Sequence, residues 1–429
     1  MKRFKTVSLV ALVGVLGVAI VGASFLMFGK LFKNKLVDDT VGASSTSSIT
    51  REQQVENLLK TSDIQAAQYD YDKATSSIKA FDGYDKETSL TDALAKYAQG
   101  KSKLVKYADM SNITHIFFHS LIVDPQVAFA KDTNGGYNQY MATVSEFKKI
   151  LDELYKRNFV LVSMHDIGHL DANGNMVEGT IMLPEGKKPM VISQDDVNYY
   201  YYMQGAGFAD KLMVGDDGRP TTQYTTASGE KKQGEYDLVP ILDNFIDKHP
   251  DFSYHGRKAI LCITGYNGVL GYRTQETSTT RQAETVDAKK TADALKADGY
   301  EFASHSFGHI GFKVSSVQSI LDDDAAWDDQ VKPILGPTDL FVYPFGQDLA
   351  GLEEYSGEKF NDLYKRGFRY FANVDGSEPS WIQVHTKYLR QARRNIDGYR
   401  MFYNPELLKD LFNVQDVWEK ARPTPVKPI

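Results

Sequence analysis

Short apolar runs alternate with longer amphipathic segments along most of this chain. Beyond Asn112, consecutive apolar residues predict buried strands at THIFFHSLIV, FVLVSM, KPMVIS, KAILCITG, YEFASH, LFVYPFG and FRYFAN. Apolar residues at three- and four-residue spacing predict intervening helices at VSEFKKILDELYKRN, DLVPILDNFIDKH and AETVDAKKTADALKADG. This α/β alternation predicts parallel strands, in a barrel or an open sheet, with functional residues in the loops that follow the strands.

The segment before these strands has a helical pattern of its own. Residues 36 to about 50 are rich in small polar residues and predict a flexible spacer. From Arg51 to about Met110, the apolar spacing predicts two amphipathic helices separated by DGYDKETS. A stalk or docking surface and a helical cap on the next domain both fit this hairpin, and the cap is the simpler interpretation. We therefore divide the chain into residues 1–35, 36–110 and 111–429.

Residues 1–35 have a pattern typical of a membrane anchor. A basic start, MKRFK, precedes an apolar stretch from about Thr6 to Gly29, which is long enough to cross a hydrocarbon layer about 30 Å thick. A cleaved signal peptide usually has a shorter apolar core, although small residues near Val41 would permit late cleavage. The positive-inside rule predicts a single-pass protein of the cell membrane with its main domain extracytoplasmic, a bias that the lysines just after the span weaken.

Composition narrows the classes of function. Apolar residues make up 42% of the chain, enough for a substantial core, so wholesale disorder is not expected. The formal charge is −7 and no long basic block occurs beyond the N-terminus, so nucleic acid is not expected as a partner. The single cysteine, Cys262, lies in an apolar run, which predicts a buried thiol and excludes a disulfide framework. None of these features predicts an oligomeric state.

Two short motifs at predicted strand ends carry candidate chemistry. VISQDDVNYY places Asp195 and Asp196 after one apolar run, and FASHSFGH places His305 and His309 after another. Adjacent residues on an extended strand point in different directions, so one carboxylate can bind a metal while the other faces the substrate as a base. Each motif alone is common in turns and packed surfaces. Together, two imidazoles and a carboxylate predict an open zinc site with room for water.

A second histidine pair competes with this one. Met164-His165-Asp166-Ile167-Gly168-His169 has the same four-residue histidine spacing and also follows an apolar run. The later pair is distinguished by a separate acidic pair and by small polar neighbours, which suit a tight site. We therefore expect His165 and His169 to be mainly structural.

With its motifs in this order, the chain resembles the polysaccharide deacetylase family, also called the NodB-homology domain or carbohydrate esterase family 4. Residues 193–197 keep both acids of the family's Thr-Phe-Asp-Asp-Gly motif, and residues 305–309 match its His-Ser/Thr-x-x-His motif. Residues 342–346, Val-Tyr-Pro-Phe-Gly, resemble Arg-x-Pro-Tyr/Phe-Gly without the arginine. HIFFHS, around His119, resembles an element of a subgroup that acts on N-acetylglucosamine polymers. The resemblance extends from about Ile113 to about Asp397 and implies a deformed (β/α) barrel.

The resemblance also implies a reaction and the residues that perform it. The protein would be a metal-dependent hydrolase that removes N-acetyl groups from an N-acetylglucosamine-containing polysaccharide of the cell surface or cell wall. Asp196, His305 and His309 would hold a divalent metal ion, with zinc expected, and Asp195 would be the general base. The backbone N–H of Phe345 would stabilise the oxyanion. An O-deacetylase of another glycan and a non-catalytic glycan-binding module are the alternatives.

Several positions depart from the family pattern. Val342 replaces the arginine that binds the base, and Arg394 is our candidate for that role, although an ordinary surface or core-edge arginine fits it equally. The family's Leu-x-His motif, whose histidine protonates the leaving amine, is missing, so His385 in IQVHTKY is the candidate acid. Asp375 would orient that acid or form an Asp-Gly turn. Tyr343, next to the missing arginine, is expected to contact substrate.

Aromatic residues in two segments suggest where a sugar would bind. TGYNGVLGYRTQETSTTRQ is long and polar, and Tyr266, Tyr272 and Arg273 within it would form a sugar-binding wall, because aromatic faces suit pyranose rings. A surface insertion without function fits this segment equally well. The run from Tyr199 to Met203 follows the acidic pair, and we expect its rings to pack a helix rather than to bind substrate.

Overall fold

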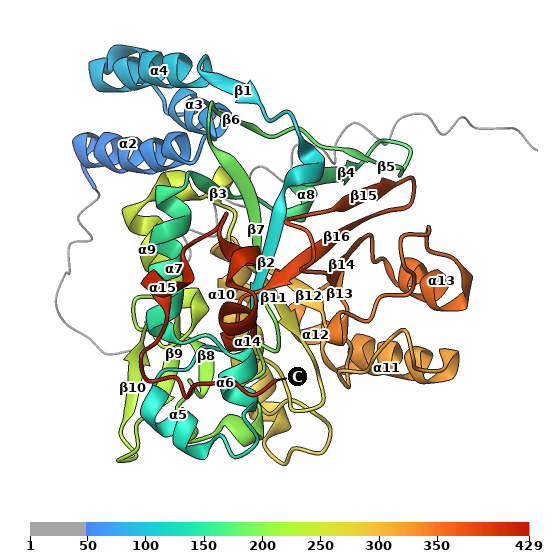
Figure 1. The fold of residues 1–429 in the computed structure, drawn as a ribbon. Helices are drawn as coiled ribbons and strands as arrows, with labels where there is room; N and C mark the ends of the chain where they lie inside the picture. Colours follow the sequence, from blue (N-terminus) through green and yellow to red (C-terminus); the bar gives the residue numbers. More distant parts are fainter. Residues whose placement is uncertain (1–48, 429) are drawn as a thin grey trace, which may run out of the picture. The chain divides into compact units, whose positions relative to one another are not determined.

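Parallel strands close into a barrel in the computed structural model, which describes residues 49–428 (Figure 1). Going round the barrel, each strand pairs with the next, and the last pairs with the first: β7 (Lys188–Gln194), β11 (Ile260–Ile263), β12 (Glu301–Ser304), β13 (Leu340–Val342), β14 (Tyr370–Val374), β16 (Tyr388–Asn395) and β2 (Thr114–Phe118). The (β/α) barrel expected from the sequence is therefore confirmed. Residues 388–395, which form its longest strand, were not among the predicted strands.

One additional strand deforms the barrel. β3 (Phe159–Leu161) pairs with the first three residues of β7, from Lys188 to Met190, whereas β11 pairs with Ser193 and Gln194 at the end of that strand. Two neighbours therefore share the same side of β7. The barrel opens at its amino end to admit β3 and closes again at its carboxyl end.

Alternation along each strand fills the interior and attaches the helices. In β11, Ile260 and Cys262 belong to the interior cluster, whereas Leu261 and Ile263 pack outward beneath the helices. Cys262 is a buried free thiol, as expected. The surrounding helices include α7 (Val144–Lys156), α9 (Leu238–Lys248), α10 (Arg281–Ala297), α11 (Val317–Gln330) and α13 (Gly357–Arg366). Helices were predicted at the first three of these places.

The local sequence of α7 shows why such a helix forms. Thr143 and Glu146 make a capping box, in which each side chain accepts a hydrogen bond from the other residue's backbone N–H. Apolar side chains recur on one face and are buried: Phe147, Ile150, Leu151 and Leu154. Glu146 is itself fully buried, and Arg422 near the C-terminus neutralises it at 2.6 Å. This pair fastens the C-terminal segment to the helix.

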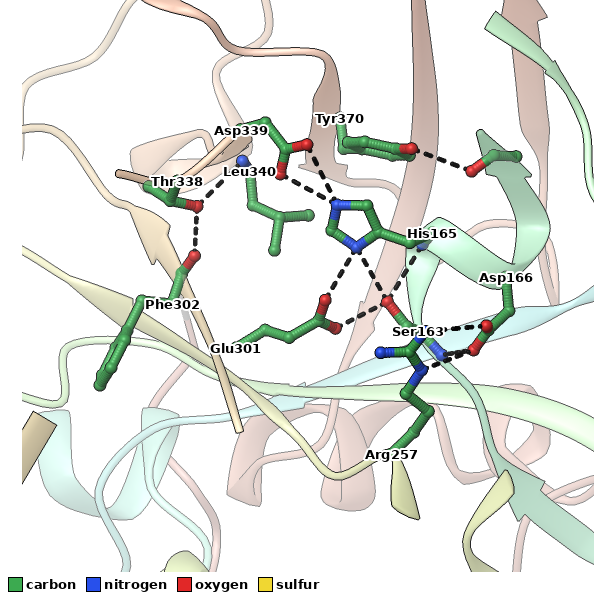
Figure 2. A network of polar contacts seen from close by, with 11 residues as sticks. Ser163, His165, Asp166, Arg257, Glu301, Phe302, Thr338, Asp339, Leu340 and Tyr370 are labelled. Atoms are coloured by element: carbon green, nitrogen blue, oxygen red, sulfur yellow. Dashed lines mark hydrogen bonds and ion pairs between the residues drawn. The ribbon is translucent and has the colours of Figure 1, made fainter. Parts of the chain in front are cut away.

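A short helix and a hairpin cover the amino ends of the barrel strands. α8 (Met164–Ile167) leads into β4 (Gly168–Leu170) and β5 (Met176–Glu178). His165 contacts Glu301 Oε1 at 2.8 Å and Asp339 Oδ1 at 3.0 Å, and these carboxylates lie at the starts of β12 and β13 (Figure 2). His169 is exposed. The earlier histidine pair therefore lies at the opposite end of the barrel from His305, and His165 ties α8 to two strands.

The helical region before the barrel differs from the expected hairpin. It has three helices, α2 (Arg51–Ala67), α3 (Tyr71–Lys79) and α4 (Thr88–Lys101), because the chain breaks at Tyr69, with φ 65°, and Asp70 caps the next helix. The Tyr69 hydroxyl donates to the carbonyl oxygen of Asp251 at 2.8 Å. β1 (Leu104–Lys106) also pairs with β6 (Met182–Pro184). Such contacts fit a cap better than a separate stalk.

A small antiparallel sheet is inserted between β7 and α9. It consists of β8 (Lys211–Val214), β9 (Pro220–Thr225) and β10 (Lys231–Gly234), and no strand was predicted there. No helix within residues 49–428 is long and apolar enough to cross a membrane. The predicted anchor, residues 1–35, lies outside the described residues.

Candidate active site

Loops at the carboxyl ends of several barrel strands surround a pocket of about 550 Å³. Asp195 and Asp196 directly follow β7, and His305 directly follows β12. The pocket is lined by residues that include His119, Tyr140, Asp195, Asp196, Tyr202, His305, His309, Phe345, Asp397 and Tyr399. Parallel strands end at the same edge, so residues distant in sequence meet there.

Asp196, His305 and His309 fit a divalent metal ion. One ligand atom from each lies within 4.8 Å of the others, and His309 Nε2 is 3.8 Å from Asp196 Oδ1. His305 Nδ1 donates to the carbonyl oxygen of Val342 at 2.7 Å, which leaves the lone pair of Nε2 for a ligand. Burial lowers the pKa of His305 to about 4, so its imidazole is neutral. Two imidazoles and a carboxylate suit zinc with one position open for water.

The loop that carries the histidines is strained and supported from α11. Ser306 and His309 have φ values of 61° and 55°, in the left-handed region that few non-glycine residues adopt. Asp323 accepts hydrogen bonds from the backbone N–H groups of Phe307 and Gly308, both at 2.7 Å. Asp323 was not predicted to act here, because nothing in an ordinary helical sequence indicates which loop its carboxylate supports.

Asp195 forms a buried ion pair with Arg393. The guanidinium donates two hydrogen bonds, at 2.6 Å to Oδ1 and 2.9 Å to Oδ2. Burial is the largest single influence and would raise the pKa of Asp195, but the charge of Arg393, its hydrogen bonds and the neighbouring histidines together outweigh burial and hold that pKa well below its ordinary value. Arg393 Nη1 also donates to Ser193 Oγ at 3.1 Å. Asp195 is therefore a fixed carboxylate beside the candidate metal ligands Asp196, His305 and His309.

The prediction that Arg394 orients Asp195 is wrong by one residue. Arg394 instead binds Asp410 through two hydrogen bonds of 2.9 Å and also donates to Thr114 Oγ1. Successive side chains on a strand face opposite sides, so Arg393 points into the barrel and Arg394 points out. The arginine that contacts Asp195 therefore comes from β16.

His385 lies at the wrong end of the barrel to be the acid. It ends β15 (Ile382–His385), where it pairs with Tyr388 at the start of β16, whereas Arg393 is near the end of that strand. Its Nε2 lies 3.3 Å from Gln383 Oε1. Asp375 accepts from Ser377 N and from the Trp381 indole, so it has the turn role rather than a partnership with His385.

His119 is the pocket histidine that the sequence prediction did not assign to catalysis. It directly follows β2, as Asp195 follows β7, and lines the pocket outside the metal cluster. Its Nδ1 donates a hydrogen bond to the carbonyl oxygen of Tyr140 at 3.1 Å, which leaves Nε2 available. The position after an apolar strand was a usable signal for this residue.

Tyr343 and Phe345, the two predicted site residues of the Tyr-Pro-Phe segment, have different environments in the structure. Tyr343 is fully buried among aromatic rings of the core, including Phe312 and Phe341, so the prediction that it contacts substrate is wrong. Phe345 lines the pocket, with φ 56° and its ring edge-on to His309 at 4.4 Å. Its backbone role at the oxyanion stays a prediction.

Tyr272 and Arg273 do not line the pocket that contains Asp196, His305 and His309. They line a separate cavity of about 860 Å³, and Tyr272 is buried. Arg273 donates to the carbonyl oxygens of Tyr199 at 2.7 Å and Asn267 at 2.9 Å, so it braces the loop after the acidic pair. The predicted sugar-binding wall is therefore not formed at this pocket.

The tyrosine run after the acidic pair differs from its expected packing role. Residues 201–203 form a single short turn, and Tyr201 and Tyr202 are exposed. Tyr202 lines the metal pocket and stacks on Tyr200 and Tyr137. Part of this run is thus a pocket wall.

Comparisons with known proteins assign no family. No family model and no curated protein matches this chain. Among solved structures, the chain is similar to "Streptococcus pyogenes deacetylase PplD in complex with acetate", with 14% sequence identity and a TM-score of 0.40. That alignment covers 72% of this chain and 99% of the other.

Proposed function

We propose that this protein is a metal-dependent deacetylase that removes N-acetyl groups from a glycan containing N-acetylglucosamine. One observation carries the proposal: a ligand cluster of two histidines and an aspartate lies beside a second, buried carboxylate held by an arginine. A structural metal site needs no such additional carboxylate. A hydrolytic site needs a group that accepts a proton from water.

The residues divide the work of hydrolysis among themselves. A zinc ion bound at the cluster would acidify water and polarise the acetyl carbonyl. Asp195 would take the proton of the attacking water, and Arg393 keeps that carboxylate ionised and oriented. His119 would donate a proton to the leaving amine through Nε2, while its other nitrogen is fixed on Tyr140. The backbone N–H of Phe345 would stabilise the oxyanion.

Aromatic side chains around the pocket support a sugar substrate. Tyr140, Tyr202, Phe345 and Tyr399 line it, and Phe345 is 66% exposed. Exposed rings at a pocket rim offer flat apolar faces on which a pyranose can lie. Because the sequence predicts an anchor and an extracytoplasmic domain, a cell-surface or cell-wall polysaccharide is the substrate we propose.

The direct test combines mass spectrometry with metal analysis. The purified full-length chain, with added zinc, should convert N-acetylglucosamine oligomers to products lighter by about 42 Da for each acetyl group lost. Asp195→Asn should keep its metal and lose about 10²–10⁴-fold in rate, because an amide cannot accept the proton. His305→Ala should lose metal and activity together.

Three results would redirect or end the proposal. Release of acetate from O-acetylated glycans alone would make the protein an esterase. Binding of oligomers without any acetate release would make it a glycan-binding module. Full activity of Asp195→Asn would remove the proposed mechanism.

A further inference from the structure

Two neighbouring tyrosines in the loop after β7 donate hydrogen bonds to different carboxylates. The Tyr199 hydroxyl donates to Asp237 Oδ2 at 2.7 Å, and the Tyr200 hydroxyl donates to Asp196 Oδ1 at 2.6 Å. Both tyrosines are buried, with 1% and 2% of their surface exposed. Asp237 caps α9, whereas Asp196 belongs to the metal cluster.

The oxygen that Tyr200 contacts is the one that faces the cluster. Asp196 Oδ1 accepts the phenol and lies 3.8 Å from His309 Nε2. Asp196 itself has φ 59°, an unusual conformation for a residue with a Cβ atom. Its carboxylate can turn about its side-chain bonds unless something holds it, so the phenol selects one orientation.

The phenol is held in turn by its own surroundings. Its oxygen lies 2.8 Å from Thr264 Oγ1 at the end of β11. The ring stacks between Tyr202 and Tyr266, with centroid distances of 5.5 and 5.1 Å. A hydroxyl fixed in this way is suited to positioning a ligand.

We infer that Tyr200 is a positioning residue that fixes Asp196 for metal binding. The inference rests on the proposed function, because it takes Asp196 as a ligand. Residues that hydrogen-bond to metal ligands orient those ligands. Loss of such a residue typically weakens metal binding about 10–100-fold. The tyrosines of this run therefore have separate roles, in which Tyr199 supports the fold, Tyr200 supports the metal site and Tyr202 forms the pocket wall.

The test compares Tyr200→Phe with Tyr199→Phe. Each variant keeps its ring and removes one buried phenol that donates to a carboxylate, so the two are matched. Zinc affinity of the full-length chain is measured by competition with a chromophoric chelator, and folding by circular dichroism. Tyr200→Phe should bind zinc about 10–100-fold more weakly, whereas Tyr199→Phe should bind zinc as the parent does. Thr264→Val, which frees the phenol from one anchor, should weaken binding less.

Each outcome decides the inference. Parent-like zinc affinity in Tyr200→Phe overturns it, and the proposed function then stands if the parent binds zinc and releases acetate. An equal loss of zinc affinity in both variants also overturns it, because the effect would then come from general destabilisation of the loop and not from the hydrogen bond to Asp196. If Tyr200→Phe is unfolded, a parent-like affinity in Thr264→Val overturns the inference and a weaker one supports it. A parent chain that binds no zinc ends the inference and the proposed function together.

Discussion

Arg393 and Arg394 are adjacent on β16 and have different roles. Arg393→Gln should raise the pKa of Asp195 and move the acid limb of the rate profile to higher pH by about one unit or more, because a nearby opposite charge lowers a carboxyl pKa by that amount. Below that limb Asp195 is protonated and cannot act as a base. The measurement is kcat/KM against pH on metal-loaded protein.

Arg394→Ala is the matched control for that experiment. It removes the ion pair with Asp410 on the outer side of the strand, so stability should fall while the acid limb stays in place. A shifted limb in Arg394→Ala, with an unchanged one in Arg393→Gln, would return the positioning role to Arg394.

His119 and His385 give a second pair of opposite expectations. His119→Gln should lower turnover about 10²–10⁴-fold with zinc content unchanged, because it removes the proposed acid and no metal ligand. His385→Gln should retain turnover, since its imidazole lies near the opposite end of β16. Zinc content and acetate release are measured on the same preparations. Equal turnover in His119→Gln and the parent would show that another group donates the proton to the leaving amine.

The sequence was sufficient to identify site residues that lie directly after a predicted strand. Asp195, Asp196 and His305 each directly follow an apolar strand, which is enough to bring them to one edge. Arg393 could not be separated from Arg394, because that choice depends on which face of β16 points inward. His385 was misplaced because β15 runs antiparallel and returns it to the amino end of the barrel.

At the scale of elements, α8 is held by one charged histidine. Burial alone would lower the pKa of His165, but hydrogen bonds with Asp339 and Glu301 outweigh it and raise that pKa to about 10. A histidine with a raised pKa stabilises the fold fully below its unfolded pKa, near 6.5, and loses that contribution as pH rises to about 10. His165→Gln should therefore lower the free energy of unfolding by about 1–3 kcal/mol at neutral pH.

The difference between parent and His165→Gln should shrink as the pH approaches about 10, the folded-state pKa of His165. Denaturant unfolding at neutral and alkaline pH measures this, with zinc affinity as a second readout that should not change. His169→Gln is the control, because the same spacing places this histidine in solvent. A difference that is constant with pH would contradict a charged network.

The strands were predictable from the sequence where apolar residues follow one another without interruption. The apolar runs that became β2, β3, β7 and the strands from β11 to β14 are buried on both faces, so no competing pattern obscures them. β16 was missed because its interior positions carry Leu389, Gln391 and Arg393, and two of these are polar. The polar side chains that make this strand functional also hide it from a search for apolar runs.

At the scale of the whole molecule, the site and the predicted anchor belong to different parts of the chain. The pocket is built from residues between 117 and 400, whereas the apolar stretch that predicts the anchor ends near Gly29. Chemistry and location can therefore be tested separately. A membrane anchor with its basic start in the cytoplasm would place the pocket on the outside, where a surface polysaccharide is reached.

The corresponding prediction concerns topology. Cells that express the full-length chain should retain it in the membrane fraction, because about 20 apolar residues suffice to cross the bilayer. In intact cells stripped of their wall, added protease should cleave the domain beyond Asn112. Replacing Val15 and Val18 in the apolar stretch by lysine should abolish membrane retention, since charged residues inside the bilayer are costly. Complete protection of the domain in intact cells, with cleavage only after lysis, would reverse the orientation and with it the proposal of an external substrate.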